Sequence, residues 1–389
     1  MHTFARTAAS AALAAAVASG MLLLSTTIVT PAYAQSAPQS ANLTQPQLES
    51  LVSSIALYPD SLLSQMLMAS TYPLEVAEAA NWLRSNPHLS GTALQDALKP
   101  QTWDNSVKSL VTFPEALNLM GNQLGWTQKL GDAYLAQPKD LMQAVQSLRA
   151  KARQAGNLRS NAQVTVSSDP QSNIIIVPSN PQVVYVPTYN PMMVYGAWPY
   201  AAYPPYPMYN PAWGLMSFGI GMAVGAALWS TPHWGSGSIT INNNNFNNFN
   251  NRFNSLSNQR SNLVGDANTW AHNPAHRDGV PYNNAALSNR FNSNNLNQTE
   301  RNDLSRQQNA VNNWRNNASP EEKQRMDQAR QNAQNTFQRD AGSGDRFGGD
   351  RGFGGDRGFG GDRGFGGDRG FGGGRGGFGG GHFGGGFRR

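Results

Sequence analysis

Two histidines in a short run of distinct composition are the first residues whose spacing could serve chemistry. His272 and His276 lie four positions apart in the run WAHNPAHRDGVPY, with Asp278 close by. On a helix this spacing would place two imidazoles on one face, as a zinc site requires. Pro274 lies between them and favours a turn, in which both would be hydrogen-bonded or solvated loop residues. We favour the turn and expect no bound metal or cofactor.

Three carboxylates in the densest apolar stretch of the chain are the second candidate. Asp60, Glu75 and Glu78 could act as paired acids. Asp60 also suits a helix cap, and Glu75 falls in a first helical turn, where a carboxylate faces the positive end of the helix dipole. The sequence has no P-loop, no G-x-S-x-G and no H-E-x-x-H. We therefore assign no catalytic residue.

The elements that must position these side chains begin with helices. Apolar residues recur at helical spacing through residues 48–82. Two Tyr-Pro pairs, at Tyr58 and Tyr72, divide this stretch into three short helices, because the residue before a proline is pushed out of the helical region. Further helical patterns continue as far as Gly156, which fits a C-cap. The spacing predicts an all-helical domain over residues 43–157.

A change of period marks the next region, residues 161–197. Short apolar runs with alternating or β-branched residues occupy residues 164–166, 173–177, 183–186 and 193–195, separated by proline-containing turns. These runs predict a small β-sheet or a pair of hairpins. Such a sheet is marginal alone, so we expect it to pack on the helical domain.

One long stretch resembles a known family. The bacterial envelope family called domain of unknown function 3300 has a signature similar to IALYPDSLLSQMLMASTYPLEVAEAANW, and the likeness covers residues 43 to 235, through VVYVPTYNPMMVYG and beyond. The run WAHNPAHRDGVPY also resembles a motif in the later part of such proteins. The resemblance implies an exported protein of unassigned activity, and it supplies no catalytic residues.

The N-terminus predicts export. Arg6 gives a positive start, residues 11–29 are apolar, and Ala32-Tyr33-Ala34 is a cleavage box before Gln35, so residues 1–34 read as a signal peptide rather than a retained membrane anchor. We expect the mature protein in the periplasm or cell envelope, with secretion as a further destination. The chain has no cysteine, which excludes disulfides and thiolate metal sites.

Two segments of unusual composition follow. Residues 198–211 are rich in proline and tyrosine and predict either a stiff linker or a polyproline segment that a partner reads. Residues 212–230 are uncharged and glycine-rich, and we expect an apolar helix of about 25 Å, near the lower limit for crossing a bilayer. An internal helix or an irregular segment is the alternative.

Small residues in the glycine-rich segment recur every four positions. Ser217, Gly221 and Gly225 would let helix backbones approach closely, so we predict that they are interaction residues. The partner would be a membrane helix, another envelope protein or a second copy of this chain.

The C-terminal half is low in complexity, and we expect it to be largely disordered. Residues 239–298 are Asn-rich with scattered phenylalanines, residues 299–340 predict a polar helix, and residues 341–389 repeat glycine, arginine and phenylalanine. The net charge of +6 is spread thinly over this half. An aspartate precedes each arginine of the regular repeats and cancels its charge, which argues against binding to nucleic acid.

The sequence as a whole predicts an α+β fold with an N-terminal helical domain and a small β segment. We expect an exported, non-enzymatic envelope protein with a structural or interaction role. Its partner would be membrane, cell wall, another envelope protein or a second copy of this chain. The alternative is a periplasmic enzyme or metal-dependent factor that uses the acids near Tyr58 or the histidines near Trp270.

Overall fold

The computed structural model describes most of the first three quarters of the 389-residue chain. The described residues are 42–206, 214–223, 227–255 and 268–291, with the single residues 305, 324, 331 and 335. The expected signal peptide (1–34) and repeat tail (341–389) lie outside this set, as does nearly all of the expected polar helix (299–340).

Eight helices follow one another from residue 45 to residue 154, which confirms the N-terminal helices that the sequence predicts. They are α1 (Gln45–Val52), α2 (Asp60–Ser70), α3 (Pro73–Ser85), α4 (Gly91–Leu98), α5 (Asn105–Leu110), α6 (Pro114–Asn122), α7 (Leu124–Ala136) and α8 (Pro138–Gln154). The two Tyr-Pro pairs stand immediately before α2 and α3. Gly156 follows α8 with a φ of +75°, a conformation that glycine adopts without strain.

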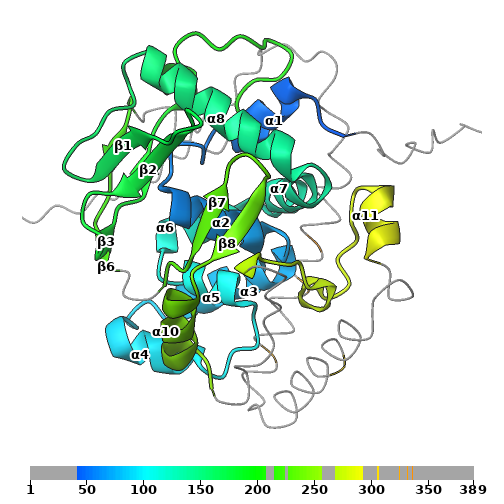
Figure 1. Cartoon of the computed structure of the whole chain (residues 1–389). Helices are drawn as coiled ribbons and strands as arrows, with labels where there is room; N and C mark the ends of the chain where they lie inside the picture. The colour runs from blue at the N-terminus through cyan, green and yellow to red at the C-terminus, as the bar shows by residue number, and fades with distance from the viewer. Residues whose placement is uncertain are drawn as a thin grey trace, which may run out of the picture. The chain divides into compact units, whose positions relative to one another are not determined.

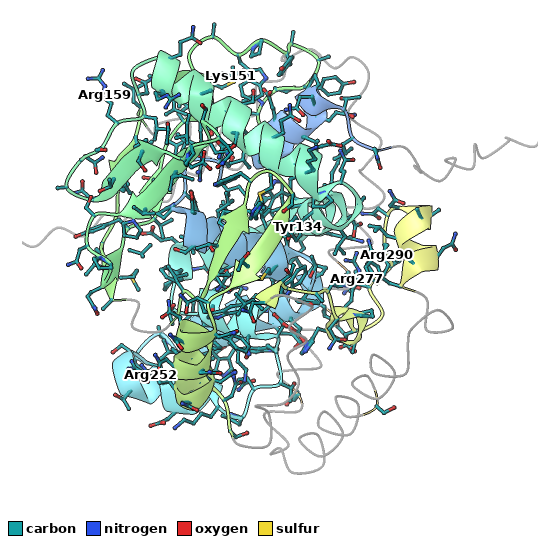
Figure 2. The ribbon with its side chains drawn as sticks, viewed as in Figure 1. Tyr134, Lys151, Arg159, Arg252, Arg277 and Arg290 are labelled. Atoms are coloured by element: carbon teal, nitrogen blue, oxygen red, sulfur yellow. The ribbon has the colours of Figure 1, made fainter. Side chains whose placement is uncertain are left out.

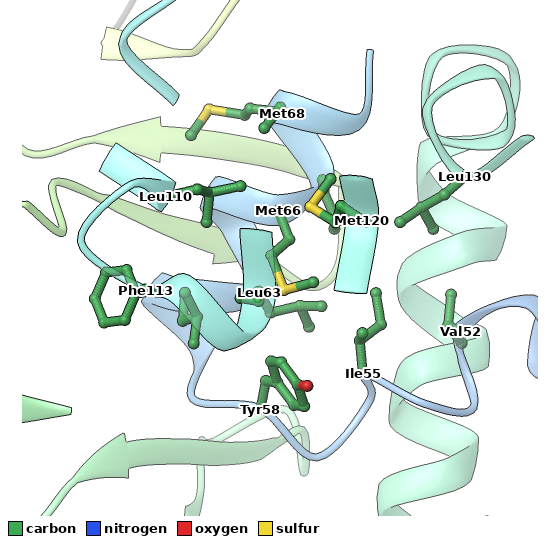
Figure 3. Packing of buried hydrophobic residues seen from close by; sticks show 14 of the residues in the cluster. Val52, Ile55, Tyr58, Leu63, Met66, Met68, Leu110, Phe113, Met120 and Leu130 are labelled. Carbon is green, nitrogen blue, oxygen red and sulfur yellow. The ribbon is translucent and has the colours of Figure 1, made fainter. Parts of the chain in front are cut away.

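The second helix lies at the centre of the apolar core. It packs against α5 and α7, and the hairpin of β7 (Ser230–His233) and β8 (Ser238–Ile241) lies over it (Figure 1). Figure 3 shows its buried Leu63 and Met66 among side chains from α5, α6 and α7. Fully burying one such side chain stabilises the fold by about 1.5–3 kcal/mol. Packing of apolar faces therefore positions the helices.

The β segment consists of two-stranded antiparallel ladders. Strand β1 (Val164–Ser168) pairs with β2 (Ile174–Pro178), and two shorter strands follow, β3 (Val183–Val184) and β4 (Pro187–Thr188). The expected strand at residues 193–195 is wrong, because residues Pro191–Val194 form the short helix α9. Asn190 caps this helix by accepting a hydrogen bond from the Met192 backbone N–H, and Pro191 suits its first turn.

The expected apolar helix over residues 212–230 is also wrong where the structure describes it. Strand β5 (Ser217–Phe218) pairs with β4, and β6 (Met222–Ala223) pairs with β3. Glycines weaken a helix here, and two open strand edges supply partners instead. Among the described helices, none has the length and apolar character needed to cross a membrane.

Two of the small residues of this segment contact the chain's own strands. Ser217 Oγ lies 2.7 Å from Thr188 Oγ1, and a Cβ at Gly221 would come within 2.5 Å of Val183 Cγ1. Gly225 lies outside the described residues. The small side chains thus fit the backbone against β3 and β4, and contact with another chain stays a prediction.

The proline- and tyrosine-rich segment is attached to the helices over its described part, residues 198–206. Ser50 Oγ donates to the Pro204 carbonyl oxygen at 2.5 Å, and the Tyr206 N–H donates to the Ser50 carbonyl oxygen at 3.3 Å. The Lys151 ammonium lies 4.9 Å from the centre of the Tyr200 ring. These contacts hold the segment against α1 and α8.

Part of the Asn-rich region belongs to the core, so the expectation of disorder is wrong for residues 243–253 and 268–291. Helix α10 (Asn243–Phe253) buries Phe246, Phe249 and Phe253, which recur at helical spacing on one face. The later stretch contains the 3-10 helix η2 (Pro274–Arg277) and α11 (Ala285–Arg290). Aromatic burial overrides the low helix propensity of asparagine.

Candidate functional site

Residues 268–291, which we name the strap, lie across the junction of α2 and α3 and against α7. The Trp270 N–H donates to the Ile239 carbonyl oxygen of β8 at 2.9 Å, and the Asn273 N–H donates to the Tyr72 hydroxyl at 3.0 Å. Figure 2 labels its two arginines, Arg277 and Arg290. The strap brings both candidate histidines to the helical domain.

The first buried pair in this site joins α3 to the strap. His276 Nδ1 lies 2.6 Å from Glu75 Oε1, and Glu75 Oε2 accepts a hydrogen bond of 2.7 Å from the Asp104 backbone N–H. Burial alone would lower the pKa of His276, but the Glu75 carboxylate beside it outweighs burial and raises that pKa. Burial also raises the pKa of Glu75, against the opposing charge of His276. The carboxylate and the imidazole are therefore coupled inside the protein, each altering the pKa of the other.

A lysine next to this pair is almost completely enclosed. Lys108 of α5 is 1 % exposed, and its ammonium donates to Asn254 Oδ1 at 2.6 Å. Burial lowers the pKa of Lys108 to about 7, although Glu75 and Asp104 oppose the shift. Asn254 also donates to Asn105 Oδ1 at 2.9 Å. The lysine and these amides fix α10 to α5.

The second buried pair joins the strap to α7. Arg277 Nη2 donates to Asp132 Oδ1 at 2.6 Å and also to the Pro281 carbonyl oxygen at 3.0 Å. Asp132 Oδ2 accepts a hydrogen bond from the Asn283 N–H at 2.9 Å. The Arg277 guanidinium stands 3.9 Å from the centre of the Tyr282 ring. Both oxygens of this carboxylate are thus used in holding the strap.

Among the described residues, the hydrogen-bonding partners of the other candidate histidine are uncharged. His272 Nδ1 lies 3.1 Å from Thr71 Oγ1, and Nε2 lies 2.8 Å from the Tyr282 hydroxyl. Its ring stacks on Tyr72 at a centroid distance of 5.1 Å. Burial lowers the pKa of His272 well below its usual value, and the charges of Arg277, His276 and Arg290 lower it further. The ring is therefore neutral at neutral pH.

The three candidate carboxylates accept hydrogen bonds from different groups. Asp60 stands at the first position of α2 rather than capping it, and its Oδ1 accepts a 2.6 Å hydrogen bond from Arg149 of α8. Glu78 Oε2 accepts from Trp103 Nε1 at 3.2 Å. Glu75 meets the candidate histidine His276. Within the described part of the chain, no group of three or more His, Cys, Asp or Glu side chains could hold a metal ion.

The cationic half of this site is not among the residues predicted from the sequence. Lys108, Arg149 and Arg277 are buried, as are the acids Asp104 and Asp132. Isolated charges inside otherwise apolar helical patterns were the available signal, because a charge is almost never fully buried unless it is paired. Which charge meets which depends on residues more than 80 positions apart, such as Asp60 and Arg149.

Comparison with known proteins places much of the described part of the chain in one family. The family described as "Protein of unknown function (DUF3300)" matches residues 44–272. The chain belongs to the DUF3300 family. The match ends at His272, so most of the strap, including Arg277, lies beyond the part that the family description covers.

A curated relative extends the likeness. The DUF3300 chain is 37% identical over 331 residues to the uncharacterized protein YacH of Escherichia coli (strain K12). The alignment covers 69% of this chain and 52% of YacH, so the chain spans about half the length of that relative. No solved structure matches the chain.

Proposed function

We propose that this DUF3300 protein is an exported, non-enzymatic protein of the cell envelope with a structural or interaction role. One observation carries the proposal: side chains able to do chemistry are buried and joined to each other across distant segments. Glu75 with His276, Asp132 with Arg277 and Asp60 with Arg149 each close one segment onto another. Such pairs hold a fold together, and removing one partner of a buried pair strongly destabilises the folded protein.

The localisation of the protein is part of the proposal and rests on the N-terminal sequence. A positive start, an apolar run and a cleavage box before Gln35 are the signature of a secretory signal. The absence of cysteine is compatible with an oxidising compartment, because the fold is then held by packing and buried polar pairs. The partners we propose are membrane, cell wall, another envelope protein or a second copy of this chain.

The experiment combines fractionation with crosslinking in a bacterium that expresses the chain from Met1. We expect a mature protein that begins at Gln35, recovered with the periplasm or envelope, with reproducible crosslinks to one partner. The isosteric variant Glu75→Gln should keep the same fraction and the same crosslinks at any temperature where it stays folded. Retention in the cytoplasm with residues 1–34 intact would overturn the proposed localisation. Loss of crosslinks in a folded Glu75→Gln variant would overturn the structural role.

An enzyme is the second candidate, and one observation favours it. Glu75, His276 and Lys108 lie together, and the pKa of Lys108 falls to about 7, a value suited to proton transfer at neutral pH. Under this candidate, envelope extracts containing the wild type would convert a substrate pool that folded Glu75→Gln leaves unchanged. Comparative metabolite analysis of the two extracts separates the candidates.

A further inference from the structure

The hydrogen bonds around His272 determine which protonation state of its ring fits the surrounding residues. Thr71 Oγ1 donates its one hydrogen to the Met68 carbonyl oxygen at 2.7 Å, so it can only accept from His272 Nδ1. Nδ1 therefore carries the proton, and Nε2 accepts from the Tyr282 hydroxyl at 2.8 Å. Burial raises the pKa of Tyr282 to about 12, so this phenol keeps its hydrogen for the bond. Both hydrogen bonds therefore require a neutral imidazole.

Within the part of the chain that the structure describes, the surroundings of the ring offer no compensation for a positive charge. Its other neighbours are aromatic rings: Tyr72, Phe291, Tyr282 and Trp270. The charged groups of the strap near it, His276, Arg277 and Arg290, repel a cation.

The carboxylates on the facing helices already have cationic partners. Glu75 of α3 is held by His276, and Asp132 of α7 is held by Arg277. A second charge on the His272 ring would therefore be buried without a partner of its own, which is strongly unfavourable.

We propose that the strap is an acid-released element, in which protonation of the His272 ring breaks its hydrogen bond to Tyr282 and frees residues 268–291 from the junction of α2 and α3. A free strap exposes its ring to water, where an ordinary histidine titrates near pH 6.5. The free form therefore binds protons more readily than the docked form as the pH falls below about 6.5. The contribution of His272 to docking therefore weakens with acid in that range.

The other titratable groups near His272 either favour docking of the strap as the pH falls or leave it unchanged. The raised pKa of His276 gives a contribution that is fully present below pH 6.5 and is lost only as the pH rises. The raised pKa values of Glu75 and Asp132 likewise favour docking as the pH falls. The lowered pKa of Lys108, about 7, leaves its contribution constant at lower pH. Release by acid therefore belongs to His272.

Hydrogen exchange of the full mature chain tests this proposal between pH 7.5 and pH 5. The readout is exchange of strap peptides relative to peptides of α8, a ratio that removes the intrinsic pH dependence of amide exchange. We expect this ratio to rise about tenfold between pH 6.5 and pH 5 in the wild type. His272→Gln, whose amide can donate and accept but does not titrate, should abolish the rise. His88→Gln, a change at an exposed histidine, should keep it.

The other possible results either support or overturn acid release of the strap. A wild-type strap as protected at pH 5 as at pH 7.5, or an equal rise in His272→Gln, overturns the proposal. Should His272→Gln fail to fold, a nitrogen-15 NMR titration of the wild-type ring replaces it. Protonation of the ring in the same pH range as a change in Trp270 fluorescence supports acid release. Protonation near pH 6.5 with the strap still docked overturns it.

Discussion

The helical domain and the strap differ in the interactions that dominate their attachment. Buried apolar residues such as Leu63 and Met66 hold the helices together, and apolar attraction is non-directional. The strap is held by directional contacts, chiefly Glu75 with His276 and Asp132 with Arg277. An apolar face accepts many partners of similar volume, whereas a buried charge accepts only its complement. The comparison predicts a robust helical core and a strap that opens as a unit.

A buried arginine inside the helical domain should show the largest effect. Arg149 is fully buried and donates to Asp60 Oδ1, to the Ala56 and Tyr58 carbonyl oxygens and to that of Ile174. We expect Arg149→Ala to lower the free energy of unfolding by about 3–5 kcal/mol, because it leaves a buried carboxylate unpaired. Denaturant unfolding measures this.

The matched control is Arg153→Ala, on the same helix. Among the hydrogen bonds that the described residues show, the Arg153 side chain makes one, to Ser168 Oγ at 3.0 Å. Its loss should change the free energy of unfolding by no more than about 0.5 kcal/mol. Equal effects of the two changes would mean that charge pairing does not help to hold the helical domain.

Two large-to-small changes sharpen the difference between the regions. Leu63→Ala should cost about 2–5 kcal/mol of global stability, since Leu63 is fully buried. Phe249→Ala removes an equally buried side chain from α10, but there it should open α10 before the helical domain unfolds. Hydrogen exchange should thus show a global effect for Leu63→Ala and a local one for Phe249→Ala. Global cooperative unfolding in both would contradict the division.

A pair of glycine changes tests the small residues of the β segment. A Cβ at Gly221 would meet Val183 Cγ1 at 2.5 Å, whereas one at Gly214 would meet nothing within 4 Å. Gly221→Ala should therefore cost about 1–3 kcal/mol by overpacking, and Gly214→Ala little. Thermal unfolding measures the cost. If Gly221→Ala leaves stability unchanged and alters membrane retention or self-association instead, Gly221 serves a partner.

Local patterns predicted the elements whose signals are local. The Tyr-Pro pairs before α2 and α3 and the glycine at position 156 determine backbone geometry at their own positions, so helix boundaries could be found there. The short helix α9 and strands β5 and β6 were missed, because a proline cap and open strand edges outweighed the apolar pattern. Two-residue strands carry no period to detect.

The site was less predictable than the helices because its partners are far apart. The histidines of the strap and the carboxylate of Glu75 were visible as candidates, yet their pairing joins residues 201 positions apart. The phenylalanines at 246, 249 and 253 did have a helical spacing, and this signal could have placed α10 in the core. Asparagine content concealed it, since asparagine has a low helix propensity.

The smallest effect we predict concerns Lys108. The cost of burying its charge can be measured through the pH dependence of stability. The unfolded lysine has an ordinary pKa near 10.4, whereas burial lowers the pKa of the folded one to about 7. Below about pH 7 both states are protonated, and the folded state carries the full cost of a buried charge. As the pH rises above 7 the folded lysine releases its proton first, so the cost falls.

The wild type should therefore gain stability relative to Lys108→Met as the pH rises, by about 1 kcal/mol between pH 7 and pH 8. Urea unfolding of both proteins at several pH values measures the difference, from which the titration of shared groups such as His276 largely cancels. Lys99→Met is the matched control, because the Lys99 side chain is 41% exposed and pairs with Asp96 on the surface. Parallel stability curves for the wild type and Lys108→Met would show that water or a rearranged carboxylate stabilises the ammonium. In that event the amides of α10 dock around an ordinary charged lysine, and the contrast between the two regions would rest on the strap alone.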